Sequence, residues 1–390
     1  MIRRHAAPFA GLAVAGVGWS LGSAPVALAG GTLLAAGALG TAWVALARRS
    51  VTLERGVSRT ALVEGDQLEV DVVLRGGGRP AGEVRLRERL GERTAPDVRL
   101  RRDRPTRVSF SSLPRGVHRL GPATIELRDP LGLAQAQVAL APGQLVRVRP
   151  RAAALAGTFL DAGTGPGGRG RSSALRASGT EPHGVRTYRD GESLRAVHWP
   201  SSARTGRLMV REMEELSRED VTVVVDLALD GAAGPPGASS MDEAARVAAS
   251  LVREQAARGR QVGLVLAGPE PTRIGIQGLG RGWEDALDAL AGAAPTARPC
   301  TAAVLANGVG RDALLVLVTA RAAAPFAEAL LRRGRCAVVS IDAPTYAGSA
   351  RAGRDAGLMR LAAHGVPIAV VRSGDDLGAV LSSRRMAAGA

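Results

Sequence analysis

The chain begins with a long apolar segment, since no charged residue lies between Ala6 and Ala47. This stretch is about twice the ~20 residues that one helix needs to cross a bilayer. The small and helix-breaking residues at 22–25 predict a turn that divides it into spans near residues 7–22 and 28–47. Because the apolar pattern resumes directly after Pro25, a retained hairpin is favoured over a cleaved signal peptide.

Arginines flank this apolar segment on both sides. Arg3 and Arg4 precede it, and Arg48 and Arg49 follow it. Basic residues next to membrane spans remain on the cytoplasmic side, so this pattern predicts that both termini are cytoplasmic. We therefore expect residues 1–49 to form a transmembrane hairpin of a two-pass protein of the cell membrane, with the lipid bilayer as its first partner.

Residues 50–150 show short runs in which apolar and polar positions alternate. The clearest runs are 68–72 and 124–127, and they are separated by turn residues such as the glycines at 76–78. Alternation with a period of two, interrupted by frequent turns, is typical of half-buried antiparallel strands. The pattern predicts an antiparallel β-sandwich domain over residues 50–150.

The segment that follows loses this periodicity. Residues 156–181 are rich in Gly, Ser and Thr, and we assign residues 151–182 to a flexible linker. The sequence GTGPGGRGRSS within it superficially resembles a phosphate-binding loop. That loop requires a Lys before Ser or Thr and a preceding strand. Both are absent from the sequence pattern, so a nucleotide site is not predicted.

Residues 221–390 alternate between apolar runs and amphipathic stretches. The predicted strands are 221–226, 262–267, 313–318, 337–341 and 368–371, and the predicted helices lie near 241–258, 282–292, 323–333 and 350–363. This alternation predicts an α/β domain with an open, doubly wound sheet. Ligands of such sheets bind at the carboxyl ends of the strands, where Asp226 would lie.

The charge of the chain is less informative than its size suggests. The formal net charge is +15, but all 51 basic residues are arginine, which together with abundant Ala and Gly is typical of a GC-rich coding sequence. Proteins that bind single-stranded nucleic acid use aromatic side chains for stacking, and aromatic residues make up only 3% of this chain. We do not predict a nucleic-acid partner. The two cysteines lack metal-ligand spacing.

Residues 183–220 form a segment with its own signature, which contains HGVRTYRDGESLRAVHWPSSARTGRLMVRE. It resembles the signature of the bacterial family called domain of unknown function 58, with Glu192 where that family usually has Asp. The matching residues are Tyr188, Gly191, Arg195, Val197, Trp199, Ser202, Ala203, Arg204, Leu208, Val210, Arg211 and Glu212. The resemblance extends upstream over RGVHRLGPATIELRDPLGLAQ, residues 115–135.

The resemblance implies more than the residue pattern does. It implies a von Willebrand factor A-like fold for the α/β domain and association with a MoxR-type AAA+ ATPase. It also implies association with membrane proteins that carry transglutaminase-like domains. In this interpretation the chain is a membrane-anchored, non-enzymatic adaptor in the assembly or maturation of envelope or metal-containing complexes.

The signature residues are the candidates for partner binding: Tyr188, Arg195, His198, Trp199, Arg204 and Arg211. Arginines bind carboxylates bidentately, and Trp, Tyr and Arg dominate interface hot spots, so this set would suit an acidic partner. Alternatively, the aromatic residues pack on the α/β domain while the arginines pair with nearby glutamates. A third interpretation is a hydrolase that uses His198 with Asp190 or Glu192, but the sequence shows no established catalytic spacing.

A divalent cation is the remaining candidate ligand. Metal-binding A-domains hold Mg²⁺ through Asp-x-Ser-x-Ser after the first strand and through a Thr and an Asp of later loops. Here Asp226 is followed by alanine and Asp230 at the two serine positions, and Thr319 is followed by alanine. The degenerate set Asp226, Asp230 and Thr319 would be the Mg²⁺ site of a cation-dependent binding module. Otherwise Asp226 caps the strand or pairs with an arginine, and we expect no cofactor.

Overall fold

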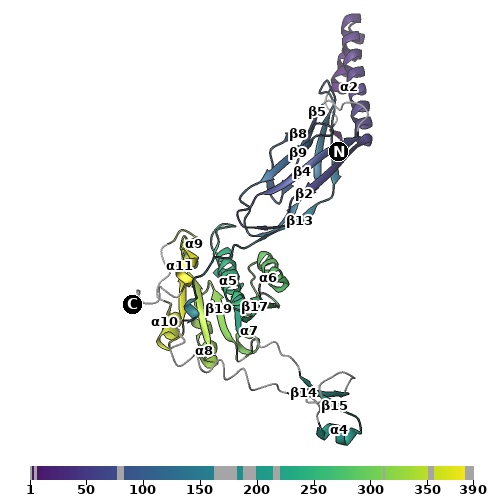
Figure 1. Cartoon of the computed structure of the whole chain (residues 1–390). Coiled ribbons are helices and arrows are strands. Elements are labelled where there is room, and N and C mark those ends of the chain that lie inside the picture. Colours follow the sequence, from purple (N-terminus) through teal and green to yellow (C-terminus); the bar gives the residue numbers. More distant parts are fainter. Residues whose placement is uncertain are drawn as a thin grey trace. The chain divides into compact units, whose positions relative to one another are not determined.

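The computed structural model describes residues 2–3, 7–76, 83–161, 182–187, 199–213, 220–310, 312–349 and 355–382. The chain forms two compact units, Met1–Pro150 and Arg151–Ala390, and each is described by itself (Figure 1). The first unit contains a helical hairpin and a set of β-sheets. The second contains an α/β domain and a small hairpin from the signature segment.

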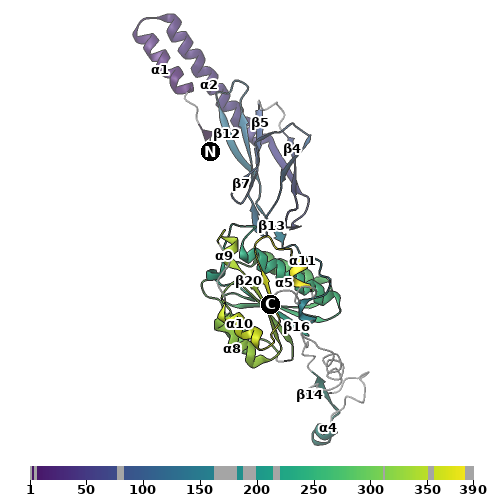
Figure 2. The same cartoon turned by 90° about the vertical axis from the view of Figure 1, so that its left-hand side faces the viewer.

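The apolar N-terminal segment forms two helices, α1 (Ala7–Ser20) and α2 (Ala24–Ser50), which lie side by side (Figure 2). Only α2 is long and apolar enough to cross a membrane by length and composition. Helix α1 begins at the predicted residue, but its 14 residues rise only about 21 Å, so the first of the two predicted spans is not confirmed. Gly22, with φ of +65°, lies in the predicted turn between the two helices.

Glycines bring the two helices into close contact. A Cβ atom on Gly30 would lie 2.2 Å from the backbone nitrogen of Ala15, and one on Gly18 would lie 2.3 Å from that of Ala27. Elsewhere the hairpin presents apolar side chains to its surroundings. The large exposed ones are Phe9, Leu12, Val14, Val17, Trp19, Leu21, Val26, Leu28, Leu39 and Leu46. The exposed faces suit an apolar solvent, and the inner faces suit helix packing.

The end of α2 belongs to the β part of the first unit. Val44 is 1% exposed and lies in the same apolar core as the strands. In addition, β1 (Ile2–Arg3) pairs with β12. The end of the hairpin and the sheets therefore belong to one compact unit, and the division into domains over 1–49 and 50–150 stays a prediction.

Three sheets surround this core, with strand orders β1-β12-β11-β5-β8, β3-β13-β10-β6-β7 and β2-β4-β9. Burial alternates along the strands, as in β4, so alternate side chains fill the core. Every described pairing of these named strands is antiparallel except β3 with β13. The strands not yet given are β2 (Val51–Val57), β3 (Ala61–Val63), β4 (Leu68–Gly76), β5 (Glu83–Arg87), β6 (Arg89–Leu90), β7 (Arg93–Thr94), β8 (Val98–Arg99), β9 (Pro105–Phe110), β10 (Gly116–Leu120), β11 (Ala123–Arg128), β12 (Gln135–Ala141) and β13 (Gln144–Arg149).

The first part of the predicted linker is not a free connection. Phe159 is fully buried in the core of the second unit, and the backbone nitrogen of Ala153 donates to Ser250 Oγ at 2.9 Å. The aromatic Phe159 and the aliphatic Leu160 explain this packing, because they bury apolar surface that a Gly-rich linker lacks. Residues 162–181 lie outside the described residues.

The predicted signature loop contains regular structure. Strands β14 (Pro182–Thr187) and β15 (Met209–Met213) pair antiparallel, and helix α4 (Trp199–Thr205) precedes the second strand. We had predicted a loop, because the many arginines obscure the apolar pattern on which strand prediction depends. Residues 188–198 lie outside the described residues.

The α/β domain is built on a six-stranded sheet with the order β18-β17-β16-β19-β20-β21. Strands β16, β17, β19, β20 and β21 are parallel, and β18 is antiparallel at the edge. The elements are β16 (Val221–Asp226), α5 (Ser240–Ala257), β17 (Gln261–Ala267), β18 (Pro271–Gln277), α6 (Arg281–Gly292), α7 (Thr301–Asn307), β19 (Leu314–Thr319), α8 (Ala324–Arg333), β20 (Cys336–Ile341), α9 (Ala343–Tyr346), α10 (Ala356–Ala363), β21 (Ile368–Val371) and α11 (Leu377–Leu381).

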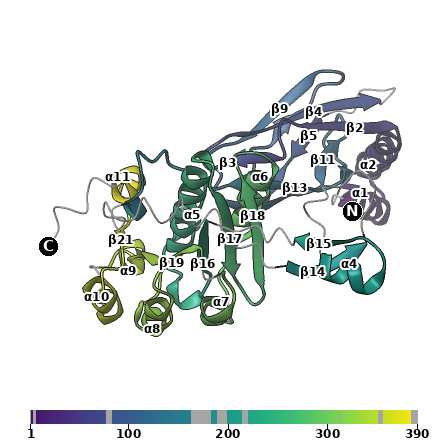
Figure 3. The same cartoon turned by 60° about the horizontal axis from the view of Figure 1, so that its bottom comes forward.

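Helices cover both faces of this sheet (Figure 3). Side chains of α5, α6 and α11 form an apolar cluster on one face, and those of α7, α8 and α10 form a second cluster on the other. Strand β17 lies on one side of β16 in the sheet, and β19 lies on the other. The direction of winding therefore reverses between β16 and β19. Such reversals open a crevice at the carboxyl ends of the two strands.

A candidate site at the carboxyl edge of the parallel sheet

A buried carboxylate lies at this reversal point. Asp226 ends β16 and is 1% exposed, and Thr319 ends the neighbouring β19 and is fully buried. Thr301 Oγ1, at the start of α7, donates to Asp226 Oδ1 at 2.6 Å, and Thr319 Oγ1 donates to Asp226 Oδ2 at 2.8 Å. Three elements that are distant in the sequence therefore meet at one carboxyl group.

Arg321 completes the site. Its Nε donates to Asp226 Oδ2 at 2.8 Å and its Nη2 donates to Asp226 Oδ1 at 3.0 Å, which is the bidentate geometry of a guanidinium–carboxylate pair. Its backbone nitrogen donates to Thr319 Oγ1 at 3.1 Å, and its guanidinium lies 4.9 Å from the ring centroid of Phe326. We call Asp226, Thr301, Thr319 and Arg321 the arginine latch.

The latch bears directly on the candidate cation site. The structure brings Asp226 and Thr319 together, whereas the Asp230 side chain is 71% exposed and its Oδ1 lies 3.6 Å from Arg321 Nε. A carboxylate offers about four acceptor positions, and four donors already occupy those of Asp226. A divalent cation would have to displace Arg321, so this donor set does not fit a resident metal.

Arg321 was not among the residues that we singled out in the sequence. A signal for it exists, because Arg321 follows the predicted strand end at Thr319 by two residues. Adjacent parallel strands would place those ends together if their order were known. Elsewhere in the described residues, no group of three or more His, Cys, Asp and Glu side chains could hold a metal ion.

The signature residues are only partly described. Tyr188, Arg195 and His198 lie outside the described residues, and the backbone of Arg211 pairs with Val185 in the β14–β15 hairpin. A serine of α4 bonds to the β14–β15 hairpin. Ser202 is buried, and its Oγ accepts a hydrogen bond at 2.8 Å from the backbone nitrogen of Met209.

Helix α4 carries the two partner-binding candidates whose exposure is described. Trp199 is 64% exposed, and Arg204 in the last helical turn is exposed. Leu208, just after the helix, is 40% exposed. Trp and Arg are enriched in interface hot spots, so both exposed side chains are candidates for contact with a partner.

The side chains of His118, His364 and Cys336 have local, structural surroundings. His118 Nε2 lies 2.8 Å from the carbonyl oxygen of Pro114, and His364 Nδ1 lies 2.8 Å from that of Arg360, so both rings bond to local backbone. Burial raises the pKa of the Cys336 thiol, which disfavours the reactive thiolate.

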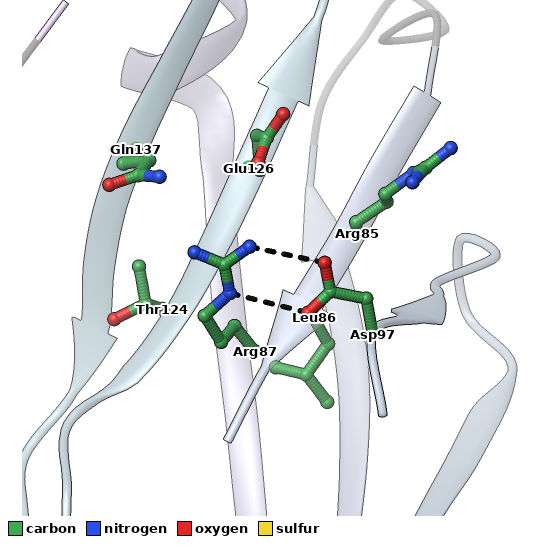
Figure 4. A pocket seen from close by; sticks show the side chains of 7 residues that line it. All are labelled: Arg85, Leu86, Arg87, Asp97, Thr124, Glu126 and Gln137. Carbon is green, nitrogen blue, oxygen red and sulfur yellow. Dashed lines mark hydrogen bonds and ion pairs between the residues drawn. The ribbon is translucent and has the colours of Figure 1, made fainter. Parts of the chain in front are cut away.

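A shallow pocket in the first unit is already filled by an ion pair (Figure 4). It lies on the outer face of β5, β8, β11 and β12, where Arg87 and Asp97 form two hydrogen bonds of 3.2 and 3.1 Å. Arg87 holds the pKa of the Asp97 carboxyl below its usual value through these bonds. The pocket is therefore a charged sheet surface and has no room for a ligand of useful size.

The structure thus defines a class of protein. It is an α/β protein with an open sheet, and an arginine side chain, instead of a metal ion, binds the carboxylate at the carboxyl edge of that sheet. The model of the family described as "Protein of unknown function DUF58" matches residues 184–385, which is more than half of the chain. The protein belongs to this family. The match includes most of the β14–β15 hairpin and the whole described α/β sheet.

No significant match was found among curated proteins. Similar solved structures include a conjugative transposon lipoprotein from Bacteroides eggerthii, at 14% identity over 23% of this chain and 94% of that chain, with a TM-score of 0.17. Another is a chain of the complex of zinc 2-glycoprotein and prolactin inducible protein from human seminal plasma, at 9% identity over 26% and 96%, with a TM-score of 0.19. A third is Cwp6 from Clostridium difficile, at 9% identity over 83% and 37%, with a TM-score of 0.15. These likenesses are too slight to support an argument.

Proposed function

We propose that this protein is a membrane-anchored, non-enzymatic adaptor whose signature segment docks a MoxR-type AAA+ ATPase. The observation that carries the proposal is the surface of α4, on which Trp199, at 64% exposure, and Arg204 are both exposed. Tryptophan is enriched among the residues that carry most of the binding energy of interfaces, so an exposed Trp199 suits the anchor of a docking surface. The kind of partner comes from the family resemblance, and the surface chemistry adds that it should be acidic.

The architecture of α4 suits a docking element. The Ser202 bond to Met209 ties the helix to β15, and Thr205 Oγ1 donates to the carbonyl oxygen of Ser201 at 2.8 Å. A preorganised surface loses less conformational entropy on binding than a mobile loop does. The tie therefore favours recognition through a helix α4 that is held in one orientation.

The second part of the proposal concerns the α/β domain, which we assign to the von Willebrand factor A-like class. Support comes from the strand order, in which an antiparallel third strand, β18, lies at the edge of an otherwise parallel sheet. The arginine latch supports a role that needs no metal, since Arg321 already neutralises Asp226. In this proposal the domain is an interaction module in the assembly or maturation of envelope or metal-containing complexes.

The third part is the membrane anchor, which we propose to be a two-pass hairpin with both termini in the cytoplasm. Its support is the apolar exposed surface of α1 and α2 and the pair Arg48 and Arg49 in the last turn of α2. A transglutaminase-like membrane protein is a further partner that the family resemblance implies.

The test is isolation of the tagged, detergent-solubilised protein from its native host with a non-hydrolysable ATP analogue, followed by mass spectrometry. We expect an AAA+ ATPase in the eluate, reduced at least tenfold by Trp199→Ala or Arg204→Glu. The matched control is Arg298→Glu, which makes the same charge change at an exposed position of the α/β domain.

Three results would each count against a part of the proposal. If the ATPase is recovered with Arg204→Glu as fully as with Arg298→Glu, α4 is not the docking surface. Recovery of lipid or nucleic acid without an ATPase would reject the adaptor function. Loss of the ATPase with the control as well would indicate general electrostatic attraction in place of a defined surface.

A further inference from the structure

One turn of the β-sheet unit is fixed directly against the membrane hairpin. Asp129, which follows β11, is 4% exposed, and its carboxylate accepts backbone hydrogen bonds from Leu131 at 3.0 Å and from Ala134 at 2.6 Å. The Gly132 nitrogen closes the turn on the Asp129 carbonyl oxygen at 3.0 Å. The turn is therefore rigid, and its only charged side chain is buried.

This turn packs on α2 at a glycine. A Cβ on Gly40 would lie 3.1 Å from Asp129 Oδ2 and 3.5 Å from the Ala134 Cβ, so the helix and the turn are in contact at this level. The same turn presents Leu131, which is 70% exposed, next to the exposed Pro130. A rigid, uncharged tip with an exposed leucine thus lies beside the hairpin.

The length of the hairpin sets the depth of this tip. From Ala24 to Gly40 the helix α2 rises about 25 Å, at 1.5 Å per residue. The hydrocarbon core of a bilayer is about 30 Å thick. The part of the hairpin above Gly40 is therefore about 5 Å shorter than the core, and its own tip, with Trp19 at 85% exposure, carries no charge.

We propose that the turn Asp129–Ala134 is a third lipid contact of this protein, and that Leu131 inserts at the cytoplasmic edge of the hydrocarbon core beside Gly40. When the hairpin tip reaches the far interface, the near edge of a core about 30 Å thick lies about 5 Å beyond Gly40 along α2, which places Gly40 and the adjoining turn within the edge of the core and immerses Leu131. The β-sheet unit is then held against the bilayer surface at a fixed height. This inference rests on the proposed membrane anchor and adds where the membrane boundary lies.

The experiment places an environment-sensitive fluorophore on a cysteine at position 131, in the full chain reconstituted into phosphatidylcholine and phosphatidylglycerol vesicles. Quenching by a lipid with a spin label near the glycerol end of its acyl chain reports contact with the interface. Leu28→Cys, in the hairpin, is the positive control, and Val117→Cys, an exposed apolar position of β10, is the negative control. The parent chain, labelled in parallel, gives the contribution of the half-buried Cys300 and the buried Cys336.

We expect Leu131→Cys to be quenched at least twofold more than Val117→Cys, and Leu28→Cys to be quenched strongly. Quenching at 131 equal to that at 117, with Leu28→Cys still quenched, would overturn the inference and leave the anchor intact. If none of the three positions is quenched, the membrane anchor itself fails. Because Leu131 is exposed, its substitution does not remove core packing, and an unchanged thermal midpoint checks this.

Discussion

Removal of the Arg321 guanidinium should loosen the centre of the α/β sheet. Asp226 is 1% exposed, so Arg321→Ala leaves a buried carboxylate with only the hydroxyls of Thr301 and Thr319. Removing one partner of a buried ion pair costs about 3–5 kcal/mol, because the remaining charge is uncompensated. The Arg321 side chain is 22% exposed, so we lower the expectation to about 2–4 kcal/mol.

The assay is amide hydrogen exchange of β16 and β19 in the detergent-solubilised full chain, since exchange through local or subglobal opening reports the stability of these strands. A loss of about 2–4 kcal/mol corresponds to exchange that is about 30- to 1,000-fold faster. Arg332→Ala is the control, because Arg332 pairs with Glu328 on the exposed face of α8 and both side chains are more than two-thirds exposed. Surface pairs of this kind contribute little, so we expect only a few-fold change at most.

Two further variants separate charge from geometry. Arg321→Lys restores a cation without the planar fork and should recover only part of the protection. Asp226→Asn combined with Arg321→Ala should cost less than the sum of the two single changes, because the buried charge is then absent. Exchange in Arg321→Ala that matches Arg332→Ala would refute the reasoning. So would protection in the parent chain that rises on addition of millimolar Mg²⁺, since Arg321 would then not be the resident cation.

Two other predictions follow from the first unit. Burial raises the pKa of Glu88 more strongly than the Arg55 ion pair lowers it, so stability falls as pH rises from the unfolded value of 4.5 through the folded-state pKa. Glu88→Gln should flatten the decline of the thermal midpoint as the pH rises above 4.5, and an unchanged slope would contradict this. Gly30→Ala should speed amide exchange in α1, because its Cβ would clash with the backbone of Ala15, whereas Gly31→Ala meets open space and should change nothing. Equal exchange in the two glycine variants would exclude close packing of the hairpin.

Much of the α/β domain could be predicted from the sequence. The strand Val221–Asp226 has the same bounds in the prediction and in the structure, as does Ile368–Val371. Uninterrupted apolar runs of this length fit strands that are covered on both faces, because every side chain must leave water. The edge strand Pro271–Gln277 was missed, since most of its side chains are exposed and its sequence lacks the apolar signal.

The candidate site was only partly accessible from the sequence. The strand pattern placed Asp226 and Thr319 at strand ends, and their side chains do meet. Arg321 was overlooked, because its partner Asp226 is 95 residues away and the contact depends on β16 lying next to β19. The order of strands follows from how the helices wind around the sheet, which no local spacing encodes.

The sequence by itself determined the apolar N-terminal segment, the alternating strands, the buried parallel strands and the family signature, because each depends on residues close together in the chain. The tertiary structure decided which glycines face the neighbouring helix, where α2 joins the β core, and that a guanidinium closes the edge of the sheet. These features depend on contacts between distant segments, such as Gly40 with Asp129 and Asp226 with Arg321. A hydrophobic pattern specifies which face of an element is buried, but the partner of that face is chosen by packing.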